Sequence, residues 1–364
     1  MGKRQITTAL WGLILAAALA GCASGGSPGN RPASGDTGRL TVSFLDVGQG
    51  DAALVRFPNE GAWLVDGGPP GSEAAVRAAL RQAGVQRLQA VVASHPHADH
   101  IGGLADLLPA FRPEEALDSG FQHPTPVLID YLRAVKVSGA RFRTLRAGER
   151  LEPAPGVHVE VLAPTERFIR GSESDVNNNS VVFRLTFGRI RFLFTGDLER
   201  AGRERIYHSS QAGWLPAEVL KVAHHGSANG TDAAWLRRVR PQIAIISCGR
   251  GNEYGHPHWE TLAALGAARV RVYRTDRNGT ITVSTDGRSI QVSAGGASRR
   301  EEGERSASEG IPTGGVVGNA ASRVYHTPEC ASLPSSARRM PFASRSAAEA
   351  AGYRPHAACV HRPR

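Results

Sequence analysis

Short apolar blocks separated by polar turns fill the central part of the chain, and their lengths are those of strands and short helices. Residues 40–45 (LTVSFL) alternate between apolar and polar positions, which predicts a strand, and residues 88–93 (LQAVVA) read as a buried strand. Residues 72–83 have helical spacing, with Ser72 as a candidate N-cap. Two further strands are expected at 52–57 and 62–65. This order of elements predicts an α/β domain.

The following stretch consists mainly of β structure. Residues 181–187 and 190–194 are expected to pair as a hairpin across Gly188 and Arg189. Further strands are expected at 157–162, 218–222, 243–247, 270–274, 280–284 and 289–292, and helices at 102–108, 125–137, 199–207 and 259–265. Together these segments predict one folded domain over residues 40–292.

The amino-terminal segment has the pattern of an export signal. Lys3 and Arg4 precede an apolar run over residues 6–20, which ends in the sequence Leu-Ala-Gly-Cys at Cys22. This ending resembles a bacterial lipobox, so residues 1–22 are expected to be a lipoprotein signal peptide with lipid attached to Cys22; an ordinary secretory peptide is the alternative. Residues 23–39 are rich in Gly, Ser and Pro, which is typical of a flexible tether. We therefore expect an extracytoplasmic, membrane-anchored protein.

Composition and charge add one constraint on the partner. The 364 residues include 41% hydrophobic residues, which suits a globular protein, and carry a formal net charge of +10. Such a charge favours an anionic partner such as nucleic acid or a membrane surface. Most of the cations are arginines scattered along the chain, however, and scattered arginine is common on ordinary surfaces. The four cysteines are too few for a disulfide scaffold.

Three histidines and one aspartate follow the buried strand at 88–93 within six residues. They are His95, His97, Asp99 and His100, and a Gly-Gly pair closes the segment. Neutral imidazoles and a carboxylate at the end of a strand suit Zn²⁺, with Mn²⁺ or Fe as alternatives. The density and order of these residues predict a metal site.

Two later strands end in residues of the same kind. Asp197 follows the strand at 190–194, where its carboxylate could bridge two metals, although a turn or N-cap role would be favoured in isolation. His224 and His225 follow the strand at 218–222. His224, the first of the pair, is the expected ligand, and His225 is expected to support a ligand or contact substrate.

Residues 40–292 resemble the metallo-β-lactamase domain of the ComEC competence family. The matching stretches, in chain order, are FLDVGQGDAALV, WLVDGG, SHPHADHIGG, NNNSVVFRL, FLFTGD, LKVAHHGS, NEYGHPH and TDRNGTITV. The resemblance implies a metallo-β-lactamase αββα sandwich that binds two divalent metal ions, Zn or Mn. Phosphorylcholine esterases have a similar catalytic domain. The chain looks like a stand-alone, secreted relative of the competence proteins.

The resemblance also implies how the ligands are shared. His95, His97 and Asp197 would hold the first ion, and Asp99, His100, Asp197 and His224 the second. A third histidine that many superfamily members use at the first ion is replaced here by residues 177–180 (NNNS).

Besides Asp99 and Asp197, two residues are candidates for a catalytic role. His256 could act as a general acid or orient the substrate, with a loop-capping role as the alternative, and Asn179 could orient the phosphodiester.

The carboxyl-terminal part begins with a mixed-charge linker at 293–315, followed by a module at 316–364. The module resembles the zinc-binding domain of Ada-type DNA repair methyltransferases. The resemblance implies one structural Zn held by His326, Cys330, His356 and Cys359; a Cys330–Cys359 disulfide is the alternative. Methyl transfer is not expected, because a histidine replaces the acceptor cysteine. Several arginines suggest a DNA-backbone contact, with a purely structural appendage as the alternative.

Three functions remain open on the sequence. The first is a membrane-tethered, metal-dependent phosphodiesterase, specifically an extracytoplasmic nuclease related to DNA uptake. The second is a phosphorylcholine-esterase-like enzyme acting on small phosphodiesters. The third is a non-enzymatic, DNA-binding surface lipoprotein. The expected partners are accordingly DNA or another phosphodiester, and a membrane contacted through the lipid anchor.

Overall fold

The computed structural model describes residues 38–295 and, towards the carboxyl terminus, residues 315–319, 322–328, 330, 332–334, 339–342, 344–357 and 359. The expected signal peptide, the lipidation site Cys22 and nearly all of the tether lie outside the described residues, as does most of the linker. Within the described part, every helix is too short or too polar to span a membrane.

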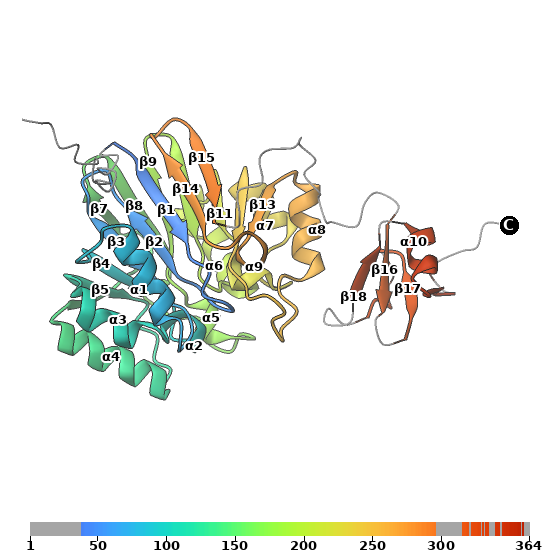
Figure 1. Cartoon of the computed structure of the whole chain (residues 1–364), viewed down its shortest axis with the longest axis horizontal. Helices are drawn as coiled ribbons and strands as arrows, with labels where there is room; N and C mark the ends of the chain where they lie inside the picture. Colours follow the sequence, from blue (N-terminus) through green and yellow to red (C-terminus); the bar gives the residue numbers. More distant parts are fainter. Residues whose placement is uncertain are drawn as a thin grey trace, which may run out of the picture. The chain divides into compact units, whose positions relative to one another are not determined.

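The first sheet has eight strands in the order β15-β14-β1-β2-β3-β4-β5-β6. Their bounds are β1 Leu40–Phe44, β2 Ala53–Arg56, β3 Ala62–Val65, β4 Ala90–Ala93, β5 Glu115–Asp118, β6 Arg141–Thr144, β14 Ile281–Thr285 and β15 Ile290–Ala294. Pairing is antiparallel from β15 to β3 and parallel from β3 to β6. Helices α1 (Glu73–Gln82), α3 (Leu104–Phe111) and α4 (Pro126–Ser138) lie along this sheet (Figure 1).

The second sheet has seven strands in the order β13-β12-β11-β10-β9-β8-β7. Their bounds are β7 Arg150–Ala154, β8 Val157–Ala163, β9 Val182–Phe187, β10 Ile190–Phe194, β11 Val219–Lys221, β12 Ile243–Ile246 and β13 Arg271–Arg274. Strands β10 to β13 are parallel. The longer helices on this side are α6 (Arg200–Tyr207), α7 (Ala233–Val239) and α8 (Trp259–Ala267). Short helical turns are α2 Ala98–Ile101, α5 Asp175–Asn178, α9 Thr275–Asn278, η1 Ser210–Trp214 and η2 Ala223–Gly226.

Three apolar clusters hold these layers together. The central cluster is formed by inward-facing residues of both sheets, and the stacked rings of Phe44, Phe183 and Phe194 cross it with centroids 5.9 and 4.6 Å apart. A second cluster joins the first sheet to α1, α3 and α4, and a third joins the second sheet to α6, α7 and α8. Each large buried side chain contributes about 1.5–3 kcal/mol. The layers form the αββα sandwich of a metallo-β-lactamase fold, as the sequence predicted.

The differences from the sequence prediction lie in two edge strands, β6 and β7, and in the short interior strand β5, in which two of four residues are acidic. Strands β5, β6 and β7 had no counterpart in the prediction, and the edge strand β6 exposes Arg141 and Phe142. Edge strands pack on fewer neighbours, so their hydrophobic pattern is weak. Ser72 precedes α1 as expected, but its hydroxyl donates hydrogen bonds to the carbonyls of Gly67 (2.8 Å) and Pro69 (2.6 Å) and does not cap the helix.

The carboxyl-terminal module contains a small sheet in the order β18-β16-β17-β19 and one helix. The elements are β16 Val316–Asn319, β17 Val324–His326, β18 Arg339–Phe342, α10 Arg345–Ala350 and β19 Arg354–Pro355. The Ser344 hydroxyl caps α10 by accepting a hydrogen bond from the backbone N–H of Ala347. The apolar core of the described part of this module has four fully buried residues: Val316, Tyr325, Ala348 and Tyr353.

Candidate metal centre

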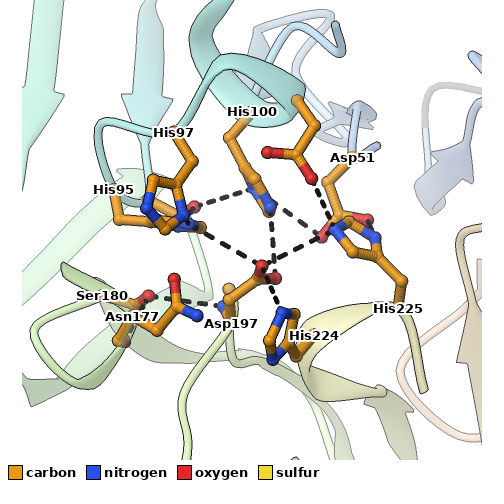
Figure 2. Close-up of polar contacts among 12 residues, drawn as sticks. Asp51, His95, His97, His100, Asn177, Ser180, Asp197, His224 and His225 are labelled. Carbon is orange, nitrogen blue, oxygen red and sulfur yellow. Dashed lines mark hydrogen bonds and ion pairs between the residues drawn. The ribbon is translucent and has the colours of Figure 1, made fainter. Parts of the chain in front are cut away.

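The ends of three strands, one from the first sheet and two from the second, deliver most of the polar residues of the site (Figure 2). His95, His97 and His100 come from the loop and short helix after β4. Asp197 follows β10, and His225 follows β11. Because β4, β10 and β11 belong to the parallel parts of their sheets, their carboxyl ends bring these residues to one edge of the sandwich.

The first group of candidate ligands contains His95, His97 and Asp197. Their ligand atoms lie within 4.8 Å of one another. His95 Nε2 is 3.0 Å from His97 Nδ1 and 3.7 Å from Asp197 Oδ2. The other ring nitrogen of His95 lies 3.1 Å from the hydroxyl of Ser94, which fixes the ring orientation.

The second group contains Asp51, His100, Asp197 and His225, all buried. His100 Nε2 lies 3.1 Å from Asp197 Oδ1, and His225 Nε2 lies 3.6 Å from Asp197 Oδ2. Asp99 faces the same histidine, with Oδ2 3.0 Å from His225 Nε2. Asp197 thus belongs to both groups, which is the arrangement expected of a bridging carboxylate.

The two consecutive histidines after β11 have different surroundings. His225 points into the second group and its Nδ1 lies 3.0 Å from the carbonyl of Ser247, whereas His224 Nδ1 lies 3.3 Å from Glu199 Oε1. His224 Nε2 is 3.9 Å from Asp197 Oδ2, farther than any ring nitrogen of the second group that faces this carboxylate. The geometry therefore favours His225 as the ligand, although the sequence favoured His224.

The backbone of this turn explains that choice. His224, His225 and Gly226 have φ angles of 51°, 52° and 86°, so three residues in a row adopt the left-handed conformation. For a non-glycine residue this conformation costs about 1–3 kcal/mol and is maintained mainly at functional sites. The resulting turn directs the second histidine to the centre, which counting from the end of the strand does not predict.

Two buried aspartates orient the histidines of the second group. Asp66 accepts hydrogen bonds from the backbone N–H (2.7 Å) and hydroxyl (2.8 Å) of Ser94 and lies 2.9 Å from His100 Nδ1. Asp51 Oδ2 lies 2.8 Å from the buried ammonium of Lys221, and Asp51 Oδ1 lies 3.6 Å from His225 Nδ1. Although burial alone would raise the pKa of Asp51, the charges of Lys221 and His225 hold it below its usual value.

No sequence motif predicted a role for Asp51, Asp66 or Lys221. One signal was present, because Lys221 interrupts an otherwise apolar strand, and a charge at a buried strand position requires a partner. Gly50 shows how close the first loop comes to the metal loop: a Cβ there would lie 2.4 Å from the carbonyl oxygen of Asp99. Only glycine allows this approach.

The donor set fits divalent metal ions. His100 Nε2, Asp197 Oδ1 and Asp51 Oδ1 are buried and make no hydrogen bond within the part of the chain that the structure describes; the first two face each other at 3.1 Å only as an ion pair. Buried polar atoms without partners are costly unless a ligand satisfies them. Imidazole and carboxylate donors are those that Zn²⁺ and Mn²⁺ accept.

The centre opens into a pocket of about 480 Å³. His256 and Tyr254 lie in its wall with their rings stacked, 5.6 Å apart, and Tyr254 is exposed. Burial and the charge of His225 lower the pKa of His256 to about 3, so its imidazole is neutral at pH 7. The residues that line the pocket include no arginine or lysine: they are Gln49, Pro69, Pro70, His97, Ala98, Asp99, Asp197, His224, His225, Glu253, Tyr254 and His256.

The asparagines of residues 177–180 divide into structural and site-facing members. Asn179, expected to orient substrate, instead uses its amide on the backbone: Nδ2 donates to the carbonyls of Ile169 and Asp175, and Oδ1 accepts from the N–H of Ile169. Asn177 is the asparagine that reaches the centre, since its Nδ2 donates to Glu199 Oε1 at 2.9 Å, beside His224 (Figure 2). The geometry thus gives Asn179 a loop-anchoring role.

The module at the carboxyl terminus gathers its four candidate ligands, His326, Cys330, His356 and Cys359. Successive Nδ1 and Sγ atoms around the group lie 3.4, 3.7, 3.3 and 3.7 Å apart. Both cysteines are free thiols, which disfavours the disulfide alternative. Two cysteines and two histidines in this arrangement are a standard set for structural zinc.

Comparisons with known proteins agree with this geometry. Residues 45–250 match the family described as the metallo-beta-lactamase superfamily. The chain is 31% identical over 258 residues to ComE operon protein 3 of Bacillus subtilis (strain 168), covering 66% of this chain and 32% of that protein. It is 30% identical to competence protein ComA of Neisseria gonorrhoeae over 251 residues, covering 69% of this chain and 33% of ComA. The chain therefore spans about a third of the length of these relatives.

Solved structures show weaker similarity. The metallo-beta-lactamase fold protein YhfI from Bacillus subtilis aligns with a TM-score of 0.46 and 13% identity, covering 68% of this chain and 99% of YhfI. The family match extends from the end of β1 to the loop beyond β12, and it includes every residue of the two ligand groups. The chain thus belongs to the metallo-β-lactamase superfamily of metal-dependent hydrolases, and its relatives are competence proteins of the ComEC type.

Proposed function

We propose that this protein is a phosphodiesterase that cleaves DNA outside the cytoplasm. The observation that carries the proposal is the pair of ligand groups sharing Asp197 at the base of an open pocket. Two-metal centres of this kind stabilise the attacking and leaving oxygens of a displacement at phosphorus. The similarity to ComEC-type competence proteins supports DNA as the phosphodiester.

The residues of the centre divide into two ligand sets. His95, His97 and Asp197 would hold one divalent ion, and His100, His225 and the shared Asp197 would hold the other. Asp99, 3.0 Å from His225, would add a carboxylate to this second set, because Asp51 is already paired with Lys221. Bound divalent ions supply Lewis-acid stabilisation of charge at phosphorus and lower the pKa of water near them.

The surrounding side chains keep these ligands in position. Asp66 orients His100 and the Ser247 carbonyl orients His225, so each imidazole presents Nε2 to the centre. His256, neutral and half-buried in the pocket wall, is placed to orient a substrate oxygen through a ring nitrogen. The Nε2 of Gln49 lies 3.4 Å from His256 Nδ1.

Hydrolysis by the purified full chain tests the proposal. Labelled single-stranded and double-stranded DNA and bis-p-nitrophenyl phosphate are each incubated with the protein and Mn²⁺ or Zn²⁺. We expect cleavage of DNA that disappears in Asp197→Ala, because this change removes a carboxylate that both ligand sets share. Asp130→Ala, which removes an exposed aspartate on α4, is the matched control and retains activity.

The outcomes separate the three functions left open by the sequence. Cleavage of bis-p-nitrophenyl phosphate without cleavage of DNA would transfer the proposal to a small phosphodiester. Cleavage of neither substrate, with DNA still bound, would favour a binding protein. The pocket favours the polymer: it is open, and Tyr254 is the one Phe, Tyr or Trp residue in its lining, whereas choline groups are recognised by aromatic cages.

The location is proposed from the sequence at the amino terminus. Lys3, Arg4 and the lipobox ending at Cys22 support export and a lipid anchor. Expression in a bacterial host with labelled palmitate should label the wild-type protein in the membrane fraction. Cys22→Ser should abolish the label; a labelled Cys22→Ser protein, or an unlabelled wild type, would contradict the anchor.

A further inference from the structure

A cluster of aromatic and arginine side chains lies in two loops that the metal centre does not use. Phe121 follows β5, and Phe168 and Arg170 lie between β8 and α5. The rings of Phe121 and Phe168 meet edge to face with centroids 5.3 Å apart. The guanidinium carbon of Arg170 lies 4.5 Å from the Phe121 centroid and 6.0 Å from the Phe168 centroid. We call Phe121, Phe168 and Arg170 the platform.

The loop that carries Phe121 also reaches the first ligand group. The ring of the candidate ligand His97 lies 5.7 Å from that of His123. His123 belongs to the same loop as Phe121, two residues further on, and is half-buried. A substrate bound at His95 and His97 can therefore extend towards the platform.

The second loop of the platform is tied to the metal centre by Asn179. This side chain holds both the N–H and the carbonyl of Ile169, the residue between Phe168 and Arg170. The next residue, Ser180, accepts a hydrogen bond from the backbone N–H of Asp197. The position of the platform is thereby coupled to that of the shared ligand Asp197. This coupling gives a reason for Asn179 to be buried with its side-chain amide hydrogen-bonded to the backbone.

The two arginines near the phenylalanines differ in what their guanidinium groups contact. Arg146 lies over the Phe168 ring, 5.1 Å from its centroid, but it also donates to the carbonyls of Ser119 and Leu145 and lies 3.7 Å from Glu166, so its polar atoms are engaged. Arg170 is exposed and makes no hydrogen bond or ion pair within residues 38–295 or the described parts of the module, although its charge adds to the hydrogen bonds from Ser172 that lower the pKa of Asp175. Its planar group therefore covers an aromatic face while its N–H donors remain free for an anion.

We propose that the platform binds an unpaired nucleotide of a single-stranded DNA substrate, with a base stacked against Phe168 and a phosphate bound by Arg170. Aromatic faces and arginine planes hold single strands because every base has a stacking surface, whereas paired bases in a duplex offer none. The metal pocket itself lacks cationic lining residues, so a positive charge for a bound phosphate has to come from outside it, and Arg170 is the cation that the platform offers. This inference rests on the proposed nuclease function and names its substrate as a single strand.

Binding measured without cleavage tests the platform independently of nuclease activity. Asp197→Ala in the full chain serves as the background, and fluorescence anisotropy reports binding of a labelled oligothymidylate. Adding Arg170→Ala or Phe168→Leu should raise the Kd about tenfold, the effect of losing one stacked base or ionic contact. Phe168→Leu keeps an apolar side chain in the loop and so preserves its packing.

The matched control is Arg189→Ala. Arg189 is also exposed, but it precedes β10, whereas Asp197 follows the other end of this strand. Its Kd should stay within twofold of the background. With an oligomer whose bases are replaced by abasic sites, Phe168→Leu should have no further effect, whereas Arg170→Ala should still weaken binding.

Two results would overturn the platform. The first is an unchanged Kd in both Arg170→Ala and Phe168→Leu while the oligothymidylate binds normally. The second is an equal loss of affinity for a blunt duplex, which would show that unpaired bases are not what the platform recognises. Neither result depends on whether the wild-type protein cleaves DNA, so the platform and the nuclease proposal fail separately.

Discussion

The two candidate metal sites of this chain differ in what holds their ligands in place. The ligands of the sandwich lie at the ends of strands packed by three apolar clusters, and aspartates, a lysine and backbone carbonyls orient the histidines. The Cys/His group lies in a module with four fully buried core residues in its described part. A core of that size contributes little stability by itself. We therefore expect the sandwich to hold its ligands in place before any metal binds, and the module to depend on a metal that joins its ligands.

Removing metal should affect the module far more than the sandwich. Structural zinc contributes about 10 kcal/mol or more to small domains, whereas the apolar clusters of the sandwich do not depend on metal. With a chelator, or in Cys359→Ser, amide hydrogen exchange at 316–319 and 324–326 should become fast while β9 and β10 stay protected. Protection of both regions after chelation would show that the module folds without metal and would remove the contrast.

Breaking the buried ion pair between Asp51 and Lys221 in the sandwich should cause the next largest loss of stability. Lys221→Met leaves the Asp51 carboxylate buried without its cation, a loss of about 3–5 kcal/mol. For a domain of this size the expected decrease in Tm is about 6–20 °C, measured by thermal unfolding. The double variant Asp51→Asn with Lys221→Met should recover most of that loss, because no unpaired charge remains. A double variant as unstable as the single one would show that the lysine acts through packing.

The ligand assignment can be tested through metal affinity. Asp66→Asn removes a carboxylate that orients His100 and should lower metal affinity about 10–100-fold. His225→Ala removes a ligand and should lower metal affinity at one of the two sites by more than that. His224→Ala should change affinity less than either, because its ring faces Glu199. Competition with a chelating dye measures all three. A larger loss in His224→Ala than in His225→Ala would restore the assignment made from sequence.

The smallest loss of stability is expected from weakening a hydrogen bond at the edge of the module's core. The hydroxyl of Tyr325 donates a hydrogen bond to Glu349 Oε1 at 2.7 Å. Glu349→Gln keeps an acceptor in place, so we expect a loss of about 1 kcal/mol or less in the unfolding free energy of the zinc-loaded protein. A change comparable to that of Lys221→Met would mean that the module relies on polar support as the sandwich does.

Local patterns in the sequence were sufficient to predict many of the strands and candidate ligands of this molecule. The buried strand before His95 and the hairpin before Asp197 were predictable because apolar runs and turn residues are neighbours in the chain. The four candidate ligands of the module were also identified, because their spacing resembles that of a known zinc-binding domain. The structure brings these four side chains together. The edge strands β6 and β7 were missed because exposed polar strands carry little hydrophobic signal.

The sequence by itself determined the order of the ligand-bearing loops and the identity of most donors, since each depends on residues close together in the chain. The αββα layering was predicted from the resemblance of the sequence motifs to those of a known family. Tertiary structure alone decided that His225 faces the centre, that Asp51 pairs with Lys221 and that Asn179 anchors the loop of Phe168. These features depend on backbone torsions within a turn and on contacts between residues far apart in the chain. Spacing in a sequence does not specify which way a side chain points once the strands have packed.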